Sequence, residues 1–173
     1  MIGRGKKVHP PKKKHTNRPR QAPVVPLSDL DRKIRAQREF EKSMIHLIEA
    51  ERLAEWGNAP NACVHSAYYA MSHCAAAAIL ASGGVGRRLD APQSHEHIIE
   101  HYGKLIASEP GYLGTSGMVL NRARTDRMVA DYDLVRGVSA SAAKVTAADA
   151  RQFVDANKIK WSFDDRVTDD LDD

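Results

Sequence analysis

The stretch from Asn61 to Leu80, NACVHSAYYAMSHCAAAAIL, most constrains how this chain can fold. It contains no Gly or Pro, follows Pro60 directly and ends shortly before the pair Gly83-Gly84. Proline is tolerated in the first turn of a helix, where its missing N–H has no partner to lose, and glycine commonly ends a helix. Because apolar residues lie on nearly every side of this stretch, we expect a helix that several others bury.

Several polar side chains interrupt the apolar stretch. His65, His73 and Tyr69 can be core groups whose hydrogen bonds are satisfied by their neighbours. Cys63 and Cys74 are eleven residues apart, which is about 16 Å along a helix axis and too far for a disulfide. Both are expected to be small buried hydrophobes rather than metal ligands. Free thiols persist in a reducing compartment, so we expect a cytoplasmic protein.

Hydrophobic periodicity predicts further helices along the chain. They are expected over residues 28–56, 94–107, about 118–135 and about 141–161. Ser28 and Ser94 are typical N-cap residues, Gly57 is a typical stop, and Ile159 is placed on the apolar side of the last helix. The first helix is longer than usual, so one end is expected to reach beyond the core or into a partner. No segment alternates as a strand would, so the sequence predicts an all-α fold, an up-and-down helical bundle of four to five helices.

The net charge of +4 hides two tails of opposite sign. Eight Lys and Arg and no acidic residue precede Asp29, whereas six Asp and one Arg lie from Asp164 onward. A segment as charged and as poor in apolar residues as the first cannot bury enough surface to fold. The sequence therefore predicts a disordered basic arm over residues 1–27, a helical domain over 28–163 and an acidic tail over 164–173.

The basic arm carries Lys12, Lys13 and Lys14 within the run KKVHPPKKKHTNRPR. Such a run attracts phosphate groups whatever their sequence context, so these lysines are candidate RNA-binding residues. A solubilising tail is the alternative, and the composition fits both. No apolar segment follows the arm, so we do not expect a secretory signal, and no run of eighteen apolar residues predicts a membrane span.

Candidate functional residues gather near the end of the fourth predicted helix. Arg124, Arg127 and Asp131 fall at i, i+3 and i+7, on one helical face, and Tyr132 follows directly. Arg127 and Asp131 can form an exposed ion pair that contributes about 0.3 kcal/mol to stability. Two arginines beside a tyrosine are equally what an RNA phosphate site requires.

Three histidines, His95, His97 and His101, lie within seven residues of one another. His97 and His101 have the i, i+4 spacing at which two imidazoles can share a metal ion, but no third ligand of suitable spacing accompanies them. The sequence therefore predicts no metal site and no cofactor.

Three motifs resemble one known family, and they occur in that family's order between Gln37 and Ser162. YYAMSHCAAAAIL, which contains Tyr69 and His73, is similar to the Tyr-Tyr-Ala-Met-Phe-His-Ala-Ala signature of HEPN-domain proteins, in the subfamily often encoded beside a minimal nucleotidyltransferase. SHEHIIEHYGKLIA, with His95 near its start, resembles the third helix of that subfamily. RMVADYD resembles its Arg…Asp-Tyr motif.

The resemblance implies a homodimeric, toxin-like protein that binds or cleaves RNA and is controlled by a nucleotidyltransferase antitoxin. In ribonucleolytic members an Arg is followed four to six residues later by a His, and two copies meet across a dimer. There the His takes a proton from the RNA 2′-hydroxyl and the Arg stabilises the phosphorane, without a metal. The catalytic residues that it implies are Arg124, Arg127, Asp131, Tyr132 and His73, with Tyr69 and His95 as binding residues.

The chain departs from this family pattern at the histidine. No His follows His101. Asp131 stands roughly in the place of the family His, and a carboxylate is a poorer base than an imidazole at neutral pH and repels phosphate. His73 or His95 can supply the imidazole if folding brings either of them to the arginines.

Two functions of different classes therefore remain. One is a HEPN-type toxin, a metal-independent endoribonuclease that acts as a homodimer. The other is a non-catalytic HEPN module whose Arg, Asp and Tyr surface is a dimer or partner interface. The resemblance favours the first, and the missing His favours the second. Ser66 and Ser72 also favour the second, because they stand where the subfamily tends to carry an Arg and an aromatic residue.

Overall fold

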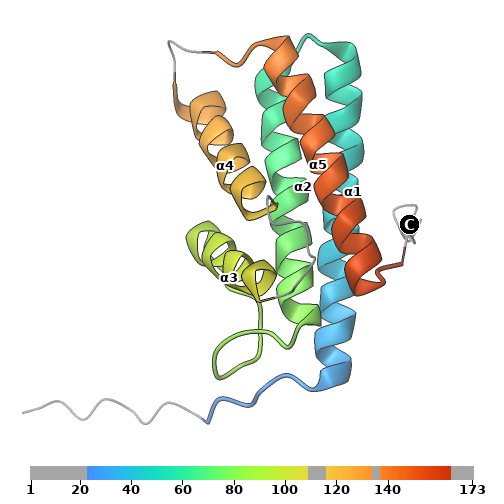
Figure 1. Cartoon of the computed structure of the whole chain (residues 1–173), viewed down its shortest axis with the longest axis vertical. Helices are drawn as coiled ribbons and strands as arrows, with labels where there is room; N and C mark the ends of the chain where they lie inside the picture. Colours follow the sequence, from blue (N-terminus) through green and yellow to red (C-terminus); the bar gives the residue numbers. More distant parts are fainter. Residues whose placement is uncertain (1–22, 109–115, 134–136, 165–173) are drawn as a thin grey trace, which may run out of the picture.

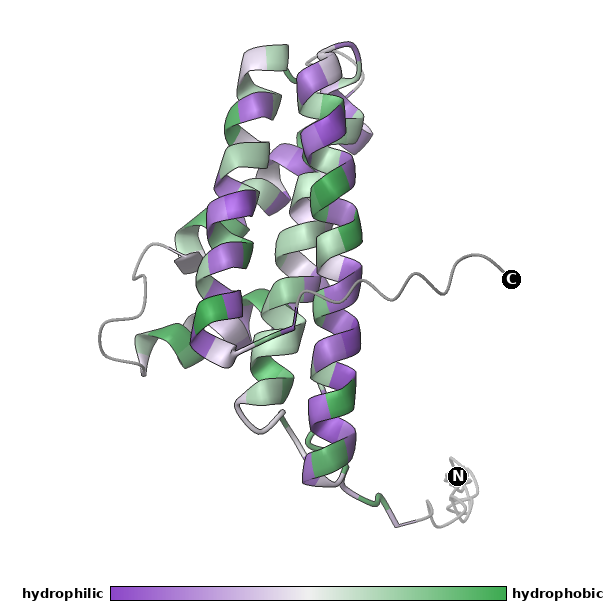
Figure 2. Cartoon of the chain, turned by 90° about the vertical axis from the view of Figure 1, so that its right-hand side faces the viewer, coloured by the Kyte–Doolittle hydropathy of each residue, from purple (hydrophilic) through white to green (hydrophobic). Residues whose placement is uncertain are grey.

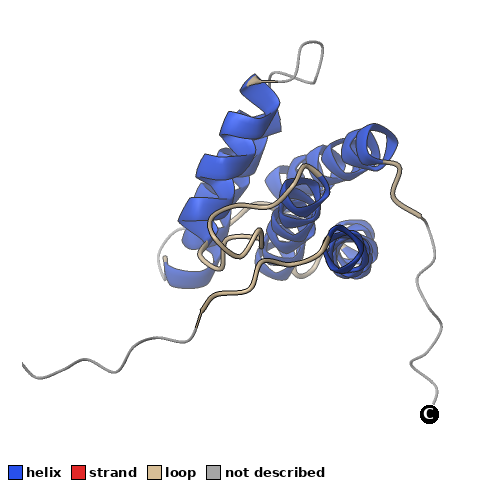
Figure 3. Cartoon of the chain, turned by 90° about the horizontal axis from the view of Figure 1, so that it is seen from below, coloured by secondary structure: helices blue, strands red, loops and turns tan. Residues whose placement is uncertain are grey.

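The computed structural model describes residues 23–108, 116–133 and 137–164 (Figure 1). Five α-helices follow one another within this part of the chain: α1 Asp29–Trp56, α2 Pro60–Ala81, α3 His95–Ala107, α4 Ser116–Tyr132 and α5 Ala140–Trp161. The same residues contain no β-strand, only an isolated bridge between Val85 and Asp90, and Figure 3 shows them as helices and loops. The predicted all-α helical bundle is confirmed.

α2 is the helix on which the others pack. It contacts all four other helices; α1 and α5 lie on one flank and α3 and α4 on the other (Figure 1). Small side chains make this possible, because Ala75, Ala76, Ala77 and Ala78 are buried and let the neighbouring backbones approach closely. The prediction of a central helix that several others bury is therefore confirmed.

Capping residues mark both ends of α1 and the start of α3. Ser28 accepts a hydrogen bond from the Asp31 N–H at 3.1 Å and caps α1. Ser94 caps α3 in the same way, accepting from the His97 N–H at 3.3 Å. Gly57 ends α1 with a φ of 74°, in the left-handed region that glycine adopts without steric cost.

α4 lies earlier in the chain than residues 118–135, its expected range. It begins at Ser116 and ends at Tyr132. The early start has a packing reason: a Cβ at Gly117 would lie 3.1 Å from Ile106 Cδ1, so glycine lets α4 approach α3 closely inside a connection that looks like a loop. The expected end at Val135 lies outside the described residues, as do residues 109–115.

The prediction that Ile159 lies on the apolar side of α5 is wrong. Its side chain is 81% exposed, although the pattern puts it on the apolar side of α5. The buried face of that helix contains Phe153, Val154 and Asn157, and at 100° per residue Ile159 points away from it. Asn157 takes the core position because its amide donates to the Tyr102 hydroxyl and to the Phe153 carbonyl, both at 2.9 Å.

The start of α1 projects beyond the core. Leu30 and Ile34, in its first two turns, are 67% and 44% exposed. The expectation that one end of this long helix reaches past the core is therefore confirmed (Figure 1). Just before the helix, the Leu27 N–H donates to the Arg88 carbonyl at 2.9 Å, which fastens the α2–α3 connection to this end of the molecule.

The two predicted tails fall largely outside the described residues. Lys12, Lys13 and Lys14 lie there with the rest of residues 1–22, and so do residues 165–173. The basic arm and the acidic tail therefore stay predictions. Residues 23–27 form no helix, and Asp164 exchanges two hydrogen bonds with Gln37 of α1, at 3.0 and 3.1 Å.

Hydropathy follows the packing of the helices. Hydrophilic residues lie along the outward sides of α1 and α5 (Figure 2). Among the described helices, none has both the length and the apolar character that crossing a membrane requires. Cys63 and Cys74 are free and buried, as expected, and burial raises the pKa of both thiols.

Candidate functional site

Four histidine rings surround one tyrosine on the side of α2 that faces α3 and α4. Tyr69 is partly buried, and its ring centroid lies 4.8 Å from that of His65, 5.6 Å from those of His46 and His95, and 6.2 Å from that of His73. These rings come from α1, α2 and α3, and we call them the Tyr69 cluster. The cluster gathers imidazoles from residues as far apart in sequence as 46 and 95.

Arg127 of α4 completes this cluster. Its guanidinium carbon lies 5.8 Å from the centre of the Tyr69 ring and 5.6 Å from that of Tyr132. Its Nε is 2.5 Å from Asp131 Oδ2, although the N–H is not aligned for a hydrogen bond, and Asp131 Oδ1 lies 3.1 Å from His65 Nδ1. The cluster therefore has cationic, anionic and titratable members in contact.

The Arg127–Asp131 pair corrects the expectation of an exposed ion pair. The two side chains are only 17% and 21% exposed. The reason is the packing of α4 on α2: Leu120 and Ala123 of α4 are buried, and the same rotation turns Arg127 inward over Tyr69. A partly buried pair is screened less by water and salt than a surface pair, so it influences its neighbours more strongly.

Arg124 and Tyr132 lie at the margins of the site. An Arg124 Nη2 donates to Glu96 Oε1 of α3 at 2.9 Å. Tyr132 contacts Arg127 but is otherwise exposed. Arg124 and Arg127 therefore both have carboxylate partners.

His95 stands at the point where α3 meets α2. Its ring lies 5.4 Å from that of Tyr68 and edge-on to that of Tyr69, and its Nδ1 is 3.5 Å from the Ser72 hydroxyl. Burial and then the positive charges of Arg127 and Arg124 lower the pKa of His95. The imidazole is therefore neutral at neutral pH, the form that can accept a proton.

A cleft of about 640 Å³ opens beside these histidines. It lies between α1, α2, the segment 90–93 and the start of α3, and Tyr69, His73 and His95 form part of its lining. The lining also contains charged residues: Arg35, Arg38, Lys42, Glu39 and Asp90. Permanent cations outnumber carboxylates there, so the cleft favours anionic ligands.

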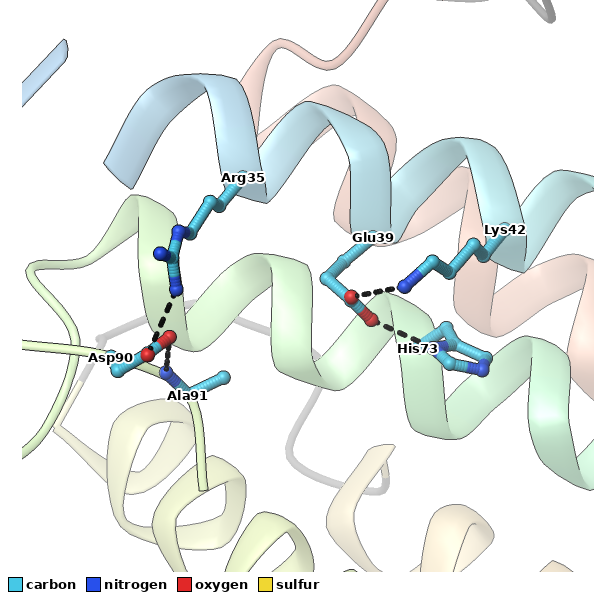
Figure 4. Close-up of polar contacts among 6 residues, drawn as sticks. All are labelled: Arg35, Glu39, Lys42, His73, Asp90 and Ala91. Atoms are coloured by element: carbon cyan, nitrogen blue, oxygen red, sulfur yellow. Dashed lines mark hydrogen bonds and ion pairs between the residues drawn. The ribbon is translucent and has the colours of Figure 1, made fainter. Parts of the chain in front are cut away.

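Two sets of polar contacts hold the walls of this cleft (Figure 4). Arg35 Nη1 donates to Asp90 Oδ2 at 3.0 Å, and Asp90 also accepts from the Ala91 N–H at 2.9 Å. Glu39 accepts from Lys42 Nζ at 2.7 Å and lies 2.7 Å from His73 Nδ1. The first set ties the α2–α3 connection to α1, and the second ties α1 to α2.

Hydrogen bonding keeps Glu39 ionised inside the cleft. Burial alone would raise the pKa of this carboxyl group, but its hydrogen bonds with His73 and Lys42 outweigh burial and hold the pKa below its ordinary value. Glu39 is therefore an acceptor for both neighbours at neutral pH.

The sequence found part of this site and missed the rest. Five of the predicted residues, Arg127, Asp131, Tyr69, His73 and His95, come together, which brings His95 to the arginines. Lys12, Lys13 and Lys14 lie outside the described residues.

The members contributed by α1 are the ones that sequence reasoning missed. Glu39, Lys42 and His46 fall at i, i+3 and i+7 and so share one helical face. That spacing was the available signal, but it does not say which neighbour the polar face meets.

No set of three or more His, Cys, Asp and Glu residues in residues 23–108, 116–133 and 137–164 is arranged to hold a metal ion. The imidazoles of the Tyr69 cluster instead contact carboxylates, a hydroxyl and one another. Side chains of these kinds can exchange protons and contact anions.

No protein-family model matches this chain, and a search of curated proteins finds no significant match.

Proposed function

We propose that this chain is a cytoplasmic, HEPN-like, toxin-like protein that acts on RNA as a homodimer and cleaves it without a metal. One observation carries the proposal: His95 and Arg127 contact the same Tyr69 ring, at 5.6 and 5.8 Å. An imidazole from α3 thereby stands beside the arginine of α4 whose expected downstream histidine is missing from the sequence. Control by a nucleotidyltransferase antitoxin rests on the sequence resemblance alone.

The chemistry needs a base and a cation at one phosphodiester. His95, which is neutral at neutral pH, takes the proton of a ribose 2′-hydroxyl, and the resulting oxygen attacks the adjacent phosphorus. Arg127 stabilises the negative charge that develops on the phosphorane oxygens. Because the attacking group is the 2′-hydroxyl, the substrate is RNA rather than DNA.

The cleft supports an RNA ligand by its charge. Arg35, Arg38 and Lys42 line it beside His73 and His95. Cationic side chains of this kind contact the phosphate backbone without reading sequence. The basic arm, if it contacts RNA, would extend the same interaction.

A second candidate function is a non-catalytic interaction module. It is favoured by the carboxylate partners of both arginines, Asp131 for Arg127 and Glu96 for Arg124. An arginine already paired is less available to a phosphate. On this account the outer surface of α4 binds a partner protein.

Cleavage and binding of single-stranded RNA by Arg127→Ala test the proposal, with Arg122→Ala as the matched control. Arg122 lies on the same helix but pairs with Asp149 of α5, away from the Tyr69 cluster. We expect Arg127→Ala to lose cleavage by about 100-fold or more and Arg122→Ala to keep it. Because Arg127 is partly buried, its substitution can affect folding. Circular dichroism therefore checks that both variants are folded before their cleavage rates are compared.

The results separate the two candidate functions. Equal cleavage by folded Arg127→Ala and the unaltered protein contradicts the role given to Arg127. An unaltered protein that leaves RNA intact but binds a protein through α4 supports the interaction module instead.

A further inference from the structure

Glu39 and His73 form a carboxylate–imidazole couple that the proposed reaction does not yet use. Glu39 Oε2 lies 2.7 Å from His73 Nδ1, across the contact between α1 and α2. Because Nδ1 is occupied by Glu39, Nε2 lies on the far side of the ring (Figure 4). Both residues line the cleft, so Nε2 is the nitrogen available for proton exchange there.

Two cations line the cleft together with this couple. Lys42 Nζ donates to the other oxygen of Glu39 at 2.7 Å. Arg38 also lines the cleft and has no carboxylate partner among the residues that the structure describes. A guanidinium that shares a cleft with an imidazole and has no carboxylate partner in the described part of the chain is suited to hold a phosphate oxygen.

We infer that His73, oriented by Glu39, is the general acid of the proposed RNA cleavage, and that Arg38 binds the phosphate on which it acts. The inference rests on the proposed function, in which His95 is the base. Both imidazoles contact Tyr69 and line one cleft, so one strand can meet both. His73 is then a catalytic residue, and Glu39 is a positioning residue that acts through it.

The step balances in atoms and protons. His95 takes the proton from the 2′-oxygen, the bond from that oxygen to phosphorus forms, and the bond from phosphorus to the 5′-oxygen breaks. Protonated His73 gives its Nε2 proton to the departing 5′-oxygen. The products are a 2′,3′-cyclic phosphate and a 5′-hydroxyl, and no oxidant, reductant or metal enters the step.

The two histidines have different electrostatic surroundings, as an acid and a base require. The charged or titratable groups around His73 are Glu39, Lys42 and His46 of α1, Tyr69 of α2 and His95 of α3, and Arg35, Arg38 and Asp90 line the same cleft. Those that face His95 are Tyr68, Tyr69 and His73 of α2 and Arg124 and Arg127 of α4. A carboxylate thus touches the acid, and two arginines lie near the base.

Substrates with different leaving groups test the role of His73 directly. RNA needs a proton on its departing 5′-oxygen, whereas a uridine 3′-(4-nitrophenyl phosphate) releases a phenolate that does not. For His73→Ala we expect a loss of about 100-fold on RNA and a small loss on the nitrophenyl substrate. His95→Ala should lose activity on both substrates, because both need the 2′-hydroxyl proton removed.

Glu39→Gln tests the positioning role with the same two substrates. Removing the carboxylate that orients His73 should slow the cleavage of RNA and change turnover of the nitrophenyl substrate little, because only RNA needs the proton that His73 gives. Glu55→Gln, the same change further along α1, should leave both rates in place. Arg38→Ala should raise KM for RNA more than it lowers kcat.

The outcomes distinguish this inference from the proposed function. If His73→Ala loses equal activity on both substrates, or if Glu39→Gln slows both substrates equally, the inference is overturned while RNA cleavage stands. If the unaltered protein cleaves neither substrate, both fail.

Discussion

Partial burial sets the protonation of individual imidazoles in the Tyr69 cluster. Burial is the first cause of the lowered pKa of His46 and of His95, and neighbouring positive charges add to it: His73 for His46, Arg127 and Arg124 for His95. These two residues are thus neutral at neutral pH in the folded protein. Each gains a proton more readily once the chain unfolds.

Stability should therefore fall as pH decreases below about 6.5, the ordinary pKa of histidine. Between that value and the lower pKa of the folded state, the unfolded chain binds more protons, which favours unfolding. We expect the melting temperature to drop between pH 7.5 and pH 5.5. In His95→Gln the drop should be smaller, and an unchanged drop in this variant would contradict the role assigned to burial of His95.

At the residue scale, the sequence predicted which residues belong to the site better than it predicted which residues they contact. Arg127 and Asp131 were found because their spacing is local to one helix. The contact of Glu39 with His73 spans 34 positions and depends on how α1 is rotated against α2, which local periodicity does not fix. The burial of Arg127 was missed for the same reason, since it follows from the packing of α4 on α2.

At the scale of elements, the connection between α2 and α3 supports one wall of the cleft. Gly84 has a φ of +69°, and a Cβ there would collide with the Leu89 carbonyl. Gly86 has a similar φ of +67°, but no atom lies within 4 Å of the position of its Cβ. The two glycines thus have similar φ angles but differ in the room that is available for a Cβ atom.

Gly84→Ala should disrupt this connection, whereas Gly86→Ala should cost only the strain of a positive φ, on the order of 1 kcal/mol. Because Asp90 and Arg35 hold the cleft wall, Gly84→Ala should also weaken RNA binding. Thermal melting and RNA titration of the two variants make the comparison. Equal destabilisation by both changes would contradict the packing of Gly84 against Leu89.

Helix boundaries were predictable where a local signal sets them. Ser28, Ser94 and Gly57 act within one turn of themselves, so sequence alone places the ends that they define. The start of α4 depends on the close approach of Gly117 to Ile106 of another helix. The exposure of Ile159 depends on which face of α5 packs against α2. The sequence pattern does not identify that face, because one of its buried residues, Asn157, is polar.

At the scale of the whole molecule, α4 exposes three large apolar side chains on its outer surface, among polar ones. Met118, Met128 and Tyr132 are exposed and lie within one arc of the helix, on the side away from α2. Homodimers commonly form through self-complementary surfaces of this kind. This surface is where we place the proposed dimer contact.

Met128→Glu should therefore shift the protein from dimer to monomer, because it places a charge within that contact. Ile159→Glu is the matched control, since Ile159 is an exposed apolar residue on α5. Light scattering at micromolar concentration measures both variants. A monomer in the unaltered protein, or equal behaviour of the two variants, would contradict a dimer formed through α4.

The central claim is that His95 supplies the imidazole that the sequence lacks downstream of Arg127. The most direct test incubates full-length protein with single-stranded RNA in excess EDTA and compares it with a His95→Ala variant shown to be folded. The account predicts fragments ending in a 2′,3′-cyclic phosphate, and a loss of about 100-fold or more in the variant. Intact RNA with the unaltered protein, or equal cleavage by His95→Ala, would contradict it.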